Sequence, residues 1–445
     1  MQRLYEPSAY DTDAPINSWW RASGVKPANF PTLETDITTE IAIIGGGYTG
    51  LNAALQLAEK HSRECVVLEA GQPGWGASGR NGGFACLGGA AMSIDEQIKK
   101  FGLTATKKYM TAQVHAVDLV RDNLNWYEIA ADTHSKGELV LAHHPRKLPK
   151  LVQHAAFQSE YFGLDHEIFN KEELEDHGVN GPEFHGGVLT KTGFALNPLK
   201  YVIGLAGAVK KAGISIFANS AAHEIRKTGA GFTILTGKAV VHAKKIIFAT
   251  NGYSSEDIPV ELSGRFLPLL STIMVTRPIS REEQNAQGWT SDLMSYDSRH
   301  LLHYFRLMPD GCFLFGQRGA VRSEERATIA AQNKNRRDFE RMFPAWKHVE
   351  TTHKWSGLLC LTLNQHQFVG PLDDLPGTYA SLGYHGNGVA MASLCGRYVA
   401  DFAVGKTPQL PPIMTQPLKR FPFPAFRRSL IRAAYLQYSV HDKWF

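Results

Sequence analysis

The chain has 445 residues, 43% of them hydrophobic and 20% charged, with a formal net charge of +5, and this length suits about two globular domains. The modest, scattered charge argues against a nucleic-acid-binding surface, and five cysteines without CxxC spacing argue against a zinc site or a disulfide framework. Because no run of about 18 apolar residues predicts a membrane-spanning helix and the N-terminus lacks a signal-peptide pattern, we expect a cytoplasmic protein without a metal, nucleic acid or integral membrane segment.

The most informative segment covers residues 39–70, TEIAIIGGGYTGLNAALQLAEKHSRECVVLEA. It predicts a strand, a glycine turn, a helix and a second strand, which is the βαβ unit that binds dinucleotides. Gly45 allows the tight turn, Gly47 lets a pyrophosphate approach the backbone, and Gly50 lets helix and strand pack closely. Glu69 follows Gly50 by 19 residues, where an acid binds a ribose 2′-hydroxyl and disfavours a 2′-phosphate.

The remaining pattern predicts an α/β chain with a mostly antiparallel second sheet. In chain order we expect an irregular arm over 1–35, a strand at 41–44, a helix over 51–60, a glycine-rich loop over 71–90, a helical region over 94–130, a strand over 137–144, a hairpin over 186–198 around Gly193, a helix over 199–211, strands over 214–221 and 244–252, antiparallel strands within 266–320, a charged helix over 324–347 and a glycine turn with a helix over 383–405. The aromatic, basic tail is more typical of a packing arm than of a membrane-surface helix.

Three glycine-rich segments follow one another along the chain, at 45–50, 71–90 and 383–388. A nicotinamide enzyme needs only the first of them. A cofactor that is both a dinucleotide and a large flat ring accounts for all three, because the second and third segments can enclose the ring. The sequence therefore favours FAD over NAD.

At these segments the chain resembles the flavin-dependent amine and amino-acid oxidoreductases of the D-amino-acid oxidase superfamily, and most of all the γ-glutamylputrescine oxidase branch. The matching motifs are IIGGGYTGLNAALQLAE, VVLEAG, GWGASGRNGG, ALNPLKYVIGLA, IIFATNGY, HYFRL, FLFGQ, TLNQHQFVG and GYHGNGV, in order over about residues 36–405. The resemblance implies a Rossmann-like FAD-binding domain from 1–95, 196–258 and 353–445. Interleaved with it would be a mostly antiparallel-sheet substrate domain from 96–195 and 259–352.

The resemblance also implies which residues hold FAD, without a covalent bond. They are Gly45, Gly47, Tyr48, Thr49, Gly50, Glu69, Ala70, Ser78, Gly79, Arg80, Asn81, Gly82, Gly83, Ala222, Asn251, Gly252, Gly386, Asn387, Gly388 and Val389. The last four would present N–H groups to the flavin ring, where a helix N-terminus stabilises the anionic reduced form.

Two positions depart from the family pattern. Relatives that act on simple α-amino acids carry an arginine in a W-x-G-L-R motif, whereas this chain has Leu359 there. Sarcosine oxidases carry a lysine in the strand that reads FLFG at 313–316 here, and that lysine promotes reaction with oxygen. The sequence therefore leaves oxidase and dehydrogenase both open, and it leaves Cys360 as a nearby cysteine without a clear role.

For substrate binding or catalysis we consider Arg306, Tyr304, His385 and Gln317. Arg306 suits a carboxylate, Tyr304 shares its strand face by the period of two, and Gln317 with Arg318 could narrow the pocket. Each could equally be structural, Arg306 in an ion pair and Tyr304 in core packing.

The expected reaction is hydride transfer from a C–N carbon of an amine or secondary amino acid to flavin. The imine would hydrolyse to amine and aldehyde, and O2 would be the acceptor, giving H2O2. Candidate substrates are γ-glutamylated polyamines and N-carboxymethyl or cyclic imino acids. The alternatives are a flavin dehydrogenase with another acceptor, a non-catalytic accessory flavoprotein and, less favoured, an NAD-dependent dehydrogenase. The oligomeric state stays open.

Overall fold

The computed structural model describes residues 1–25, 29–229 and 231–444, so positions 26–28, 230 and 445 of the predicted domain ranges lie outside the described residues. The helices are α1 Trp19–Ala22, α2 Tyr48–Leu55, α3 Ile94–Phe101, α4 Leu103–Trp126, α5 Leu148–Phe162, α6 Lys171–Asp176, α7 Pro198–Lys211, α8 Arg281–Gln287, α9 Glu325–Met342, α10 Gly388–Ala403 and α11 Arg427–Trp444. The strands are β1 Ile37–Ile44, β2 Cys65–Leu68, β3 Phe84–Ala85, β4 Glu138–Leu141, β5 His166–Phe169, β6 Gly187–Thr190, β7 Phe194–Ala195, β8 Ser215–Phe217, β9 Glu224–Thr228, β10 Gly231–Leu235, β11 Val240–Phe248, β12 Phe266–Pro278, β13 Met294–Asp297, β14 His303–Leu307, β15 Cys312–Arg318, β16 Thr351–Thr362, β17 Phe368–Pro371 and β18 Thr378–Leu382.

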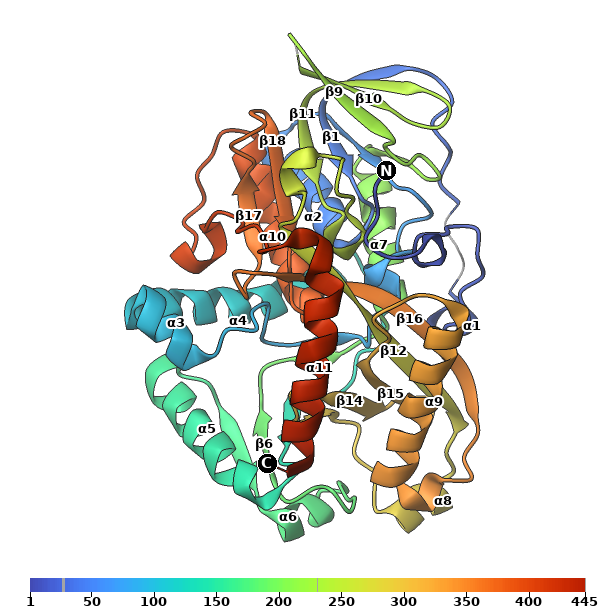
Figure 1. Ribbon diagram of the computed structural model, residues 1–445, viewed down its shortest axis with the longest axis vertical. Helices are drawn as coiled ribbons and strands as arrows, with labels where there is room; N and C mark the ends of the chain where they lie inside the picture. The colour runs from blue at the N-terminus through green and yellow to red at the C-terminus, as the bar shows by residue number, and fades with distance from the viewer. Residues whose placement is uncertain (26–28, 230, 445) are drawn as a thin grey trace.

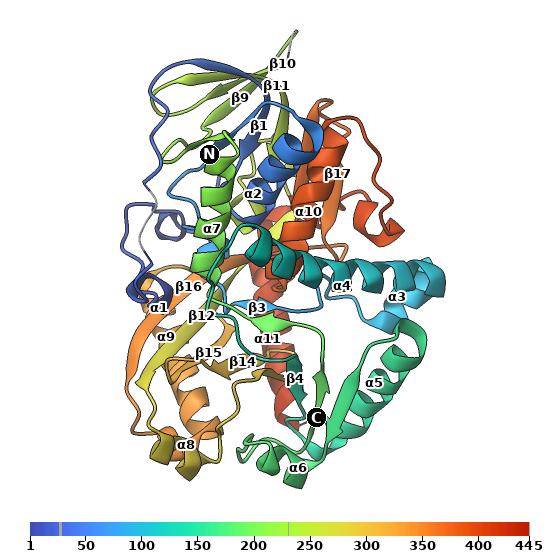
Figure 2. The ribbon, with the colours of Figure 1, turned by 180° about the vertical axis from the view of Figure 1, so that it is seen from behind.

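The first sheet has the order β17-β18-β11-β1-β2-β8, with the β9–β10 hairpin attached to β11. Its strands from β18 to β8 run parallel, as expected where helices cover the sheet and both faces are buried. The end of β1 is accordingly a continuous apolar run, Ile41 to Ile44, that is at most 8% exposed. Helices α2, α7 and α10 gather beside this sheet (Figure 2), so the predicted βαβ unit is present as β1, α2 and β2.

The second sheet has the order β16-β12-β15-β14-β13-β4-β6-β5 and is antiparallel except between β13 and β4. Alternation along its strands separates two faces. Phe305, Phe313 and Phe315 lie in an aromatic core that also contains residues of α9, whereas Tyr304 and Arg306 point to the opposite face, toward the loop at 82–83. The α/β fold class and the antiparallel second sheet expected from the sequence are confirmed.

Three local expectations need correction or refinement. The hairpin around Gly193 is wrong, because β6 pairs with β4 and β5 while β7 pairs with β3 in a separate two-stranded sheet. The helical region after residue 94 breaks at Gly102, whose φ of 82° ends α3 before α4 begins. Strand β16 pairs with β12, so the chain returns to the first sheet only at β17. The predicted domain division otherwise stays a prediction.

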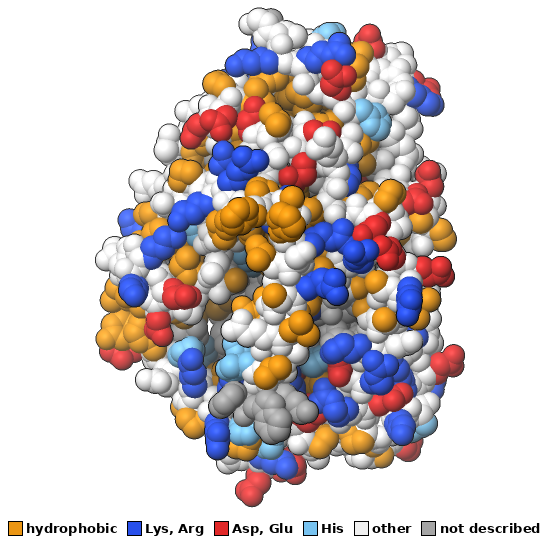
Figure 3. Space-filling view, in the orientation of Figure 1, with side chains coloured by type: hydrophobic (Ala, Val, Ile, Leu, Met, Phe, Trp, Pro, Cys, Tyr) orange, Lys and Arg blue, Asp and Glu red, His pale blue; other side chains and the backbone are white. Residues whose placement is uncertain are grey.

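Helix α11 crosses the front of the molecule beside both sheets (Figure 1). Near its beginning, hydrophobic side chains gather on the surface among Lys and Arg (Figure 3), and Phe423, Phe426 and Leu430 are 77%, 63% and 51% exposed. Among the described residues, no helix combines the length and the apolar character needed to span a bilayer.

Candidate functional site

A cavity of about 590 Å³ lies between the two sheets, within the size range of small-molecule sites. Of the residues predicted to hold a cofactor or substrate, those that line it are Gly45, Gly47, Tyr48, Thr49, Glu69, Ala70, Ser78, Arg80, Asn81, Gly82, Ala222, Asn251, Tyr304, His385, Gly386, Asn387, Gly388 and Val389. The structure thus brings the three glycine segments together around one space.

The first glycine turn is fixed by close backbone approaches. Gly45 has a φ of 115°, and a Cβ there would lie 2.7 Å from the carbonyl oxygen of Ala249, so only glycine fits without strain. The carboxylate of Glu69 accepts the N–H of Gly46 at 2.6 Å and that of Gly71 at 3.0 Å. Burial raises the pKa of Glu69, against these hydrogen bonds. Glu69 therefore joins the turn to the second loop besides bordering the cavity.

The loop at 78–83 is held by its own side chains. Ser78 Oγ accepts the N–H of Tyr48 at 3.0 Å. Asn81 donates to the carbonyls of Ala77 and Ser78 and accepts the N–H of Gly83 at 2.8 Å. A Cβ on Gly47 would lie 2.7 Å from Ser78 Oγ. The turn and the loop therefore form one cradle whose backbone can approach a ligand closely.

Four predicted glycines do not line the cavity: Gly50, Gly79, Gly83 and Gly252. They allow backbones to pack instead. A Cβ on Gly252 would lie 2.7 Å from the carbonyl oxygen of Leu359, and one on Gly83 would lie 2.7 Å from Arg306 Nη2. These glycines hold the walls of the cavity in place.

The N-terminus of α10 faces the same space. Gly386 has a φ of 108°, and no side chain caps the helix at Asn387, so the first N–H groups at Gly388 and Val389 are open to an anionic group. Asn251 Oδ1 accepts the N–H of Gly383 at 2.9 Å and ties this turn to the end of β11.

His385, in the same turn, has a buried Nδ1 without a hydrogen-bond partner among the described residues, while its Nε2 lies 3.2 Å from Thr362 Oγ1. Burial, followed by neighbouring His366 and Arg318, lowers the pKa of His385 to about 3, so the ring is neutral at pH 7. An unsatisfied polar atom, a glycine cradle and an open helix N-terminus are the features that a phosphate-bearing flat-ring cofactor satisfies. The residues present therefore fit FAD.

The four substrate candidates lie in different places. Tyr304 lines the cavity, its hydroxyl is 2.9 Å from Ser271 Oγ, and burial raises its pKa to about 12. Gln317 faces away, toward α9, and accepts a hydrogen bond from Lys334 at 2.9 Å, because it alternates with the cavity-facing residues of β15.

Arg306 is fully buried and does not line the cavity. Its guanidinium donates to the carbonyl of Leu196 at 2.8 Å and lies 3.1 Å from His134 Nε2, and burial lowers its pKa to about 9. The expected contact between Arg306 and a substrate carboxylate does not fit this placement. The guanidinium of Arg306 packs against the backbone at Gly83 and Leu196 and does not reach the cavity.

Two charged residues of the second sheet do line the cavity: Arg318 and Glu138. Arg318 was expected only to narrow the pocket, and Glu138 was missed, since a glutamate at the start of a strand gives no sequence signal. Burial raises the pKa of Glu138 to about 7, and the Cys86 thiol beside it offsets part of that rise.

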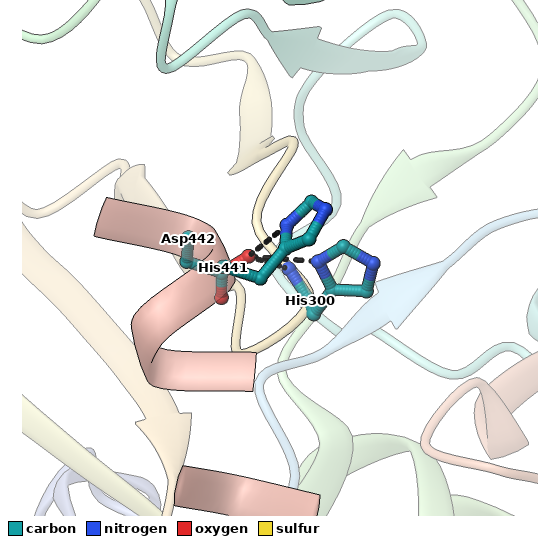
Figure 4. Close-up of side chains that lie close together, drawn as sticks. All are labelled: His300, His441 and Asp442. Carbon is teal, nitrogen blue, oxygen red and sulfur yellow. Dashed lines mark hydrogen bonds and ion pairs between the residues drawn. The ribbon is translucent and has the colours of Figure 1, made fainter. Parts of the chain in front are cut away.

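A cluster of polar side chains, His300, His441 and Asp442, joins α11 to the turn before β14, and His300 lines the cavity. Asp442 accepts the N–H of His300 and of Leu301 at 2.9 Å each, and His300 Nδ1 lies 2.8 Å from it (Figure 4). Burial raises the pKa of Asp442, but the hydrogen bonds from these N–H groups outweigh burial, so the pKa is lowered overall. His441 adds a third side chain whose ligand atom lies within 4.8 Å of the other two. Both carboxylate oxygens of Asp442 already accept N–H groups, so this cluster fastens α11 to the turn before β14, and we call it the clasp. The absence of a metal stays a prediction.

The chain is similar in sequence and in fold to known flavoproteins. A family model described as FAD dependent oxidoreductase matches residues 40–402. The chain is 31% identical over 400 residues to the probable oxidoreductase OrdL of Haemophilus influenzae, covering 89% of this chain and 90% of that protein. It is 30% identical over 432 residues to gamma-glutamylputrescine oxidoreductase of Escherichia coli, covering 96% and 98%. The crystal structure of glycine oxidase from Geobacillus kaustophilus superposes with a TM-score of 0.70 at 19% identity, covering 86% of this chain and 99% of that one, and this likeness shows the fold.

Proposed function

The chain belongs to the family of FAD-dependent oxidoreductases, and we propose that it oxidises the C–N bond of an amine or secondary amino acid with O2 as the acceptor. The resemblance read from the sequence is confirmed, and the chain is an FAD-dependent amine or amino-acid oxidoreductase. The finer proposal is supported by the continuity of one cavity, which extends from the cradle at Gly45 and Gly47 past the N-terminus of α10 to the charged face of the second sheet.

Bound in this cavity, FAD would supply a two-electron acceptor for the hydride that leaves the carbon next to nitrogen. The chain's own residues bind and orient. The cradle and the N-terminus of α10 offer N–H groups to anionic parts of the cofactor, and Tyr304 and His385, both neutral at pH 7, border the space left for substrate. The reacting nitrogen must be neutral, and the imine product hydrolyses in water to amine and aldehyde.

We propose that FAD is held without a covalent bond. Cys360 lines the cavity, but burial raises the pKa of its thiol to about 12, and the thiolate is the form that reacts. Denaturation of the purified protein should release all flavin into the supernatant. Flavin that stays with a peptide containing Cys360 would refute this part.

The substrate classes with the best support are γ-glutamylated polyamines and amines that carry a carboxylate, by analogy with the Escherichia coli relative. The FAD-loaded protein should be mixed in air with γ-glutamylputrescine, N-carboxymethyl amino acids and cyclic imino acids while peroxide and aldehyde are measured. Equal amounts of both products support an oxidase. Turnover only with an artificial electron acceptor would assign a dehydrogenase, and none with either acceptor would favour an accessory flavoprotein.

A further inference from the structure

The outer side of α11 is apolar. Of the twelve exposed large hydrophobic side chains among the described residues, six lie between residues 423 and 440. Four of these share one side of the helix, because a turn of about 100° per residue places them within about 120° of its circumference; they are Phe426, Leu430, Leu436 and Val440, between 51% and 70% exposed. A surface helix normally turns its apolar side toward the core, so this side is suited to contact with something outside the chain.

Helix α11 is fastened to the rest of the protein at its two ends. The buried guanidinium of Arg427 donates to the carbonyl of Phe266 at 2.7 Å and lies 2.9 Å from Glu256, and Asp442 forms the clasp at the other end. None of the described residues from 429 to 442 is buried. The two fastenings therefore hold the helix in one orientation, with its apolar side outward.

Phe423, just before this helix, has a strained backbone. Its φ is 50°, in the left-handed region that a bulky residue rarely adopts, and the residue is 77% exposed, so packing within the chain does not offset the strain. Pro422 and Pro424 on either side limit how the backbone can relax. Strain that persists at an exposed aromatic residue indicates that its outward position serves a contact with a partner.

The surroundings of this apolar surface are cationic. From residue 402 to residue 441 the sequence has six Lys and Arg and no Asp or Glu. Lys419, Arg420 and Arg432 are exposed and make no ion pair with any other residue that the structure describes. Burial and the charge of Lys419 lower the pKa of Lys100, so a further cation lies close by. Figure 3 shows Lys and Arg beside the apolar side chains. A partner must therefore combine apolar surface with negative charge.

An anionic lipid bilayer meets both requirements. An amphipathic helix with Phe and Leu on one side and Arg near them lies in the plane of the lipid headgroups, with its apolar side toward the acyl chains. Arginine side chains reach from this position to the lipid phosphates. A second copy of this chain fits less well, because a two-fold axis would place the same cations of both copies against each other.

We propose that the outer side of α11 together with Phe423, which we call the tail surface, docks on an anionic lipid bilayer and holds the protein there peripherally. Phe423, Phe426 and Leu430 enter the layer beneath the headgroups, and Arg420 and Arg432 bind lipid phosphates. The inference goes beyond the proposed oxidation and does not depend on it, since docking is measured without turnover.

The full-length, FAD-loaded protein should be sedimented with vesicles of phosphatidylcholine alone and of phosphatidylcholine with about one third phosphatidylglycerol. We expect the partition coefficient at low salt to be at least about tenfold higher on the anionic vesicles, and to fall toward the neutral value at about 0.5 M NaCl. The double variant Phe423→Ser/Phe426→Ser and, separately, Arg420→Gln/Arg432→Gln should each weaken binding to anionic vesicles at least about tenfold.

Matched controls replace exposed residues away from the tail surface. They are Trp126→Ser/Ile168→Ser for the apolar pair and Lys210→Gln/Lys211→Gln, at the end of α7, for the cationic pair. Both controls should bind vesicles like the wild type. All four double variants should keep the wild-type FAD content, because none of the replaced residues lines the cavity.

Equal binding of the wild type to both kinds of vesicle would overturn the proposal, and this comparison decides it even where a variant folds poorly. Unchanged binding of a folded Phe423→Ser/Phe426→Ser variant would overturn it as well. Sedimentation velocity without vesicles tests the other partner. A dimer that this variant abolishes, in a protein that does not bind anionic vesicles, would assign the tail surface to a second copy of the chain and contradict the lipid assignment.

Discussion

Replacement of Glu138 by glutamine should make the protein more stable at high pH and leave its stability at low pH nearly unchanged. Burial raises the pKa of Glu138 from an ordinary 4.5 to about 7. A carboxyl whose pKa is raised on folding contributes stability that is fully present below about pH 4.5 and is lost as pH rises through about 7. Glutamine keeps the shape but cannot ionise, so the variant escapes this loss.

The displacement from 4.5 to about 7 corresponds to about 3 kcal/mol. Because Glu138 borders a cavity that admits water, we expect about 1–3 kcal/mol, or a midpoint about 2–6 °C higher at pH 8. The neighbouring titratable groups, Cys86 and Tyr296, have pKa values raised by burial and stay neutral over this range.

Thermal unfolding of wild type and Glu138→Gln, both FAD-loaded, should be followed from pH 5 to pH 8 in one buffer system of constant ionic strength. The difference between the two midpoints should grow with pH up to about pH 7, the pKa of the folded state, and should level off above it. A difference that does not change with pH, or a variant that becomes relatively less stable as pH rises, would refute the assignment of a buried, unpaired carboxyl.

Three further variants test how the cavity is built. Gly45→Ala should lower FAD content, and the strained backbone alone should lower the free energy of unfolding by about 1–3 kcal/mol. The reason is that the φ of Gly45 is 115° and a Cβ there would meet the carbonyl of Ala249. Normal flavin content in this variant would contradict the expectation. Arg306→Ala should cost about 2–4 kcal/mol of stability and loosen bound flavin rather than raise KM selectively, because it leaves the buried carbonyl of Leu196 unpaired; an altered KM with unchanged flavin retention would return it to the substrate site. Asp442→Asn should speed proteolytic cleavage at α11 at least severalfold, with FAD content unchanged, since the clasp to the turn before β14 is lost.

Much of the cofactor cradle was predictable because its chemistry depends on backbone conformation. Gly45 and Gly386 have the positive φ values that glycine spacing indicates, and Glu69 stands where the βαβ unit requires an acid. Asn81, which the sequence predicts to contact FAD, lines the cavity and also bonds to the loop itself, and this second role has no signal in the sequence.

The substrate face was less predictable, because a period of two identifies residues that share a face without identifying which of them reach the cavity. Arg306 and Arg318 are both on the cavity side of the second sheet, yet Arg306 lies beneath Gly83 and only Arg318 borders the open space. Glu138 comes from a strand that pairs in parallel with β13, a tertiary contact with no local signal. The failed hairpin at Gly193 has the same origin, since tertiary pairing outweighs the local turn pattern.

The central claim is that one cavity joins bound FAD to a face that binds an amine. It is tested most directly by anaerobic mixing of the FAD-loaded protein with excess γ-glutamylputrescine and the other carboxylate-bearing amines, while the flavin absorbance is recorded. We expect complete loss of the oxidised-flavin band with at least one of them, one substrate consumed per flavin, and recovery of the band on admission of air. A fully loaded protein whose flavin stays oxidised with every amine would contradict it.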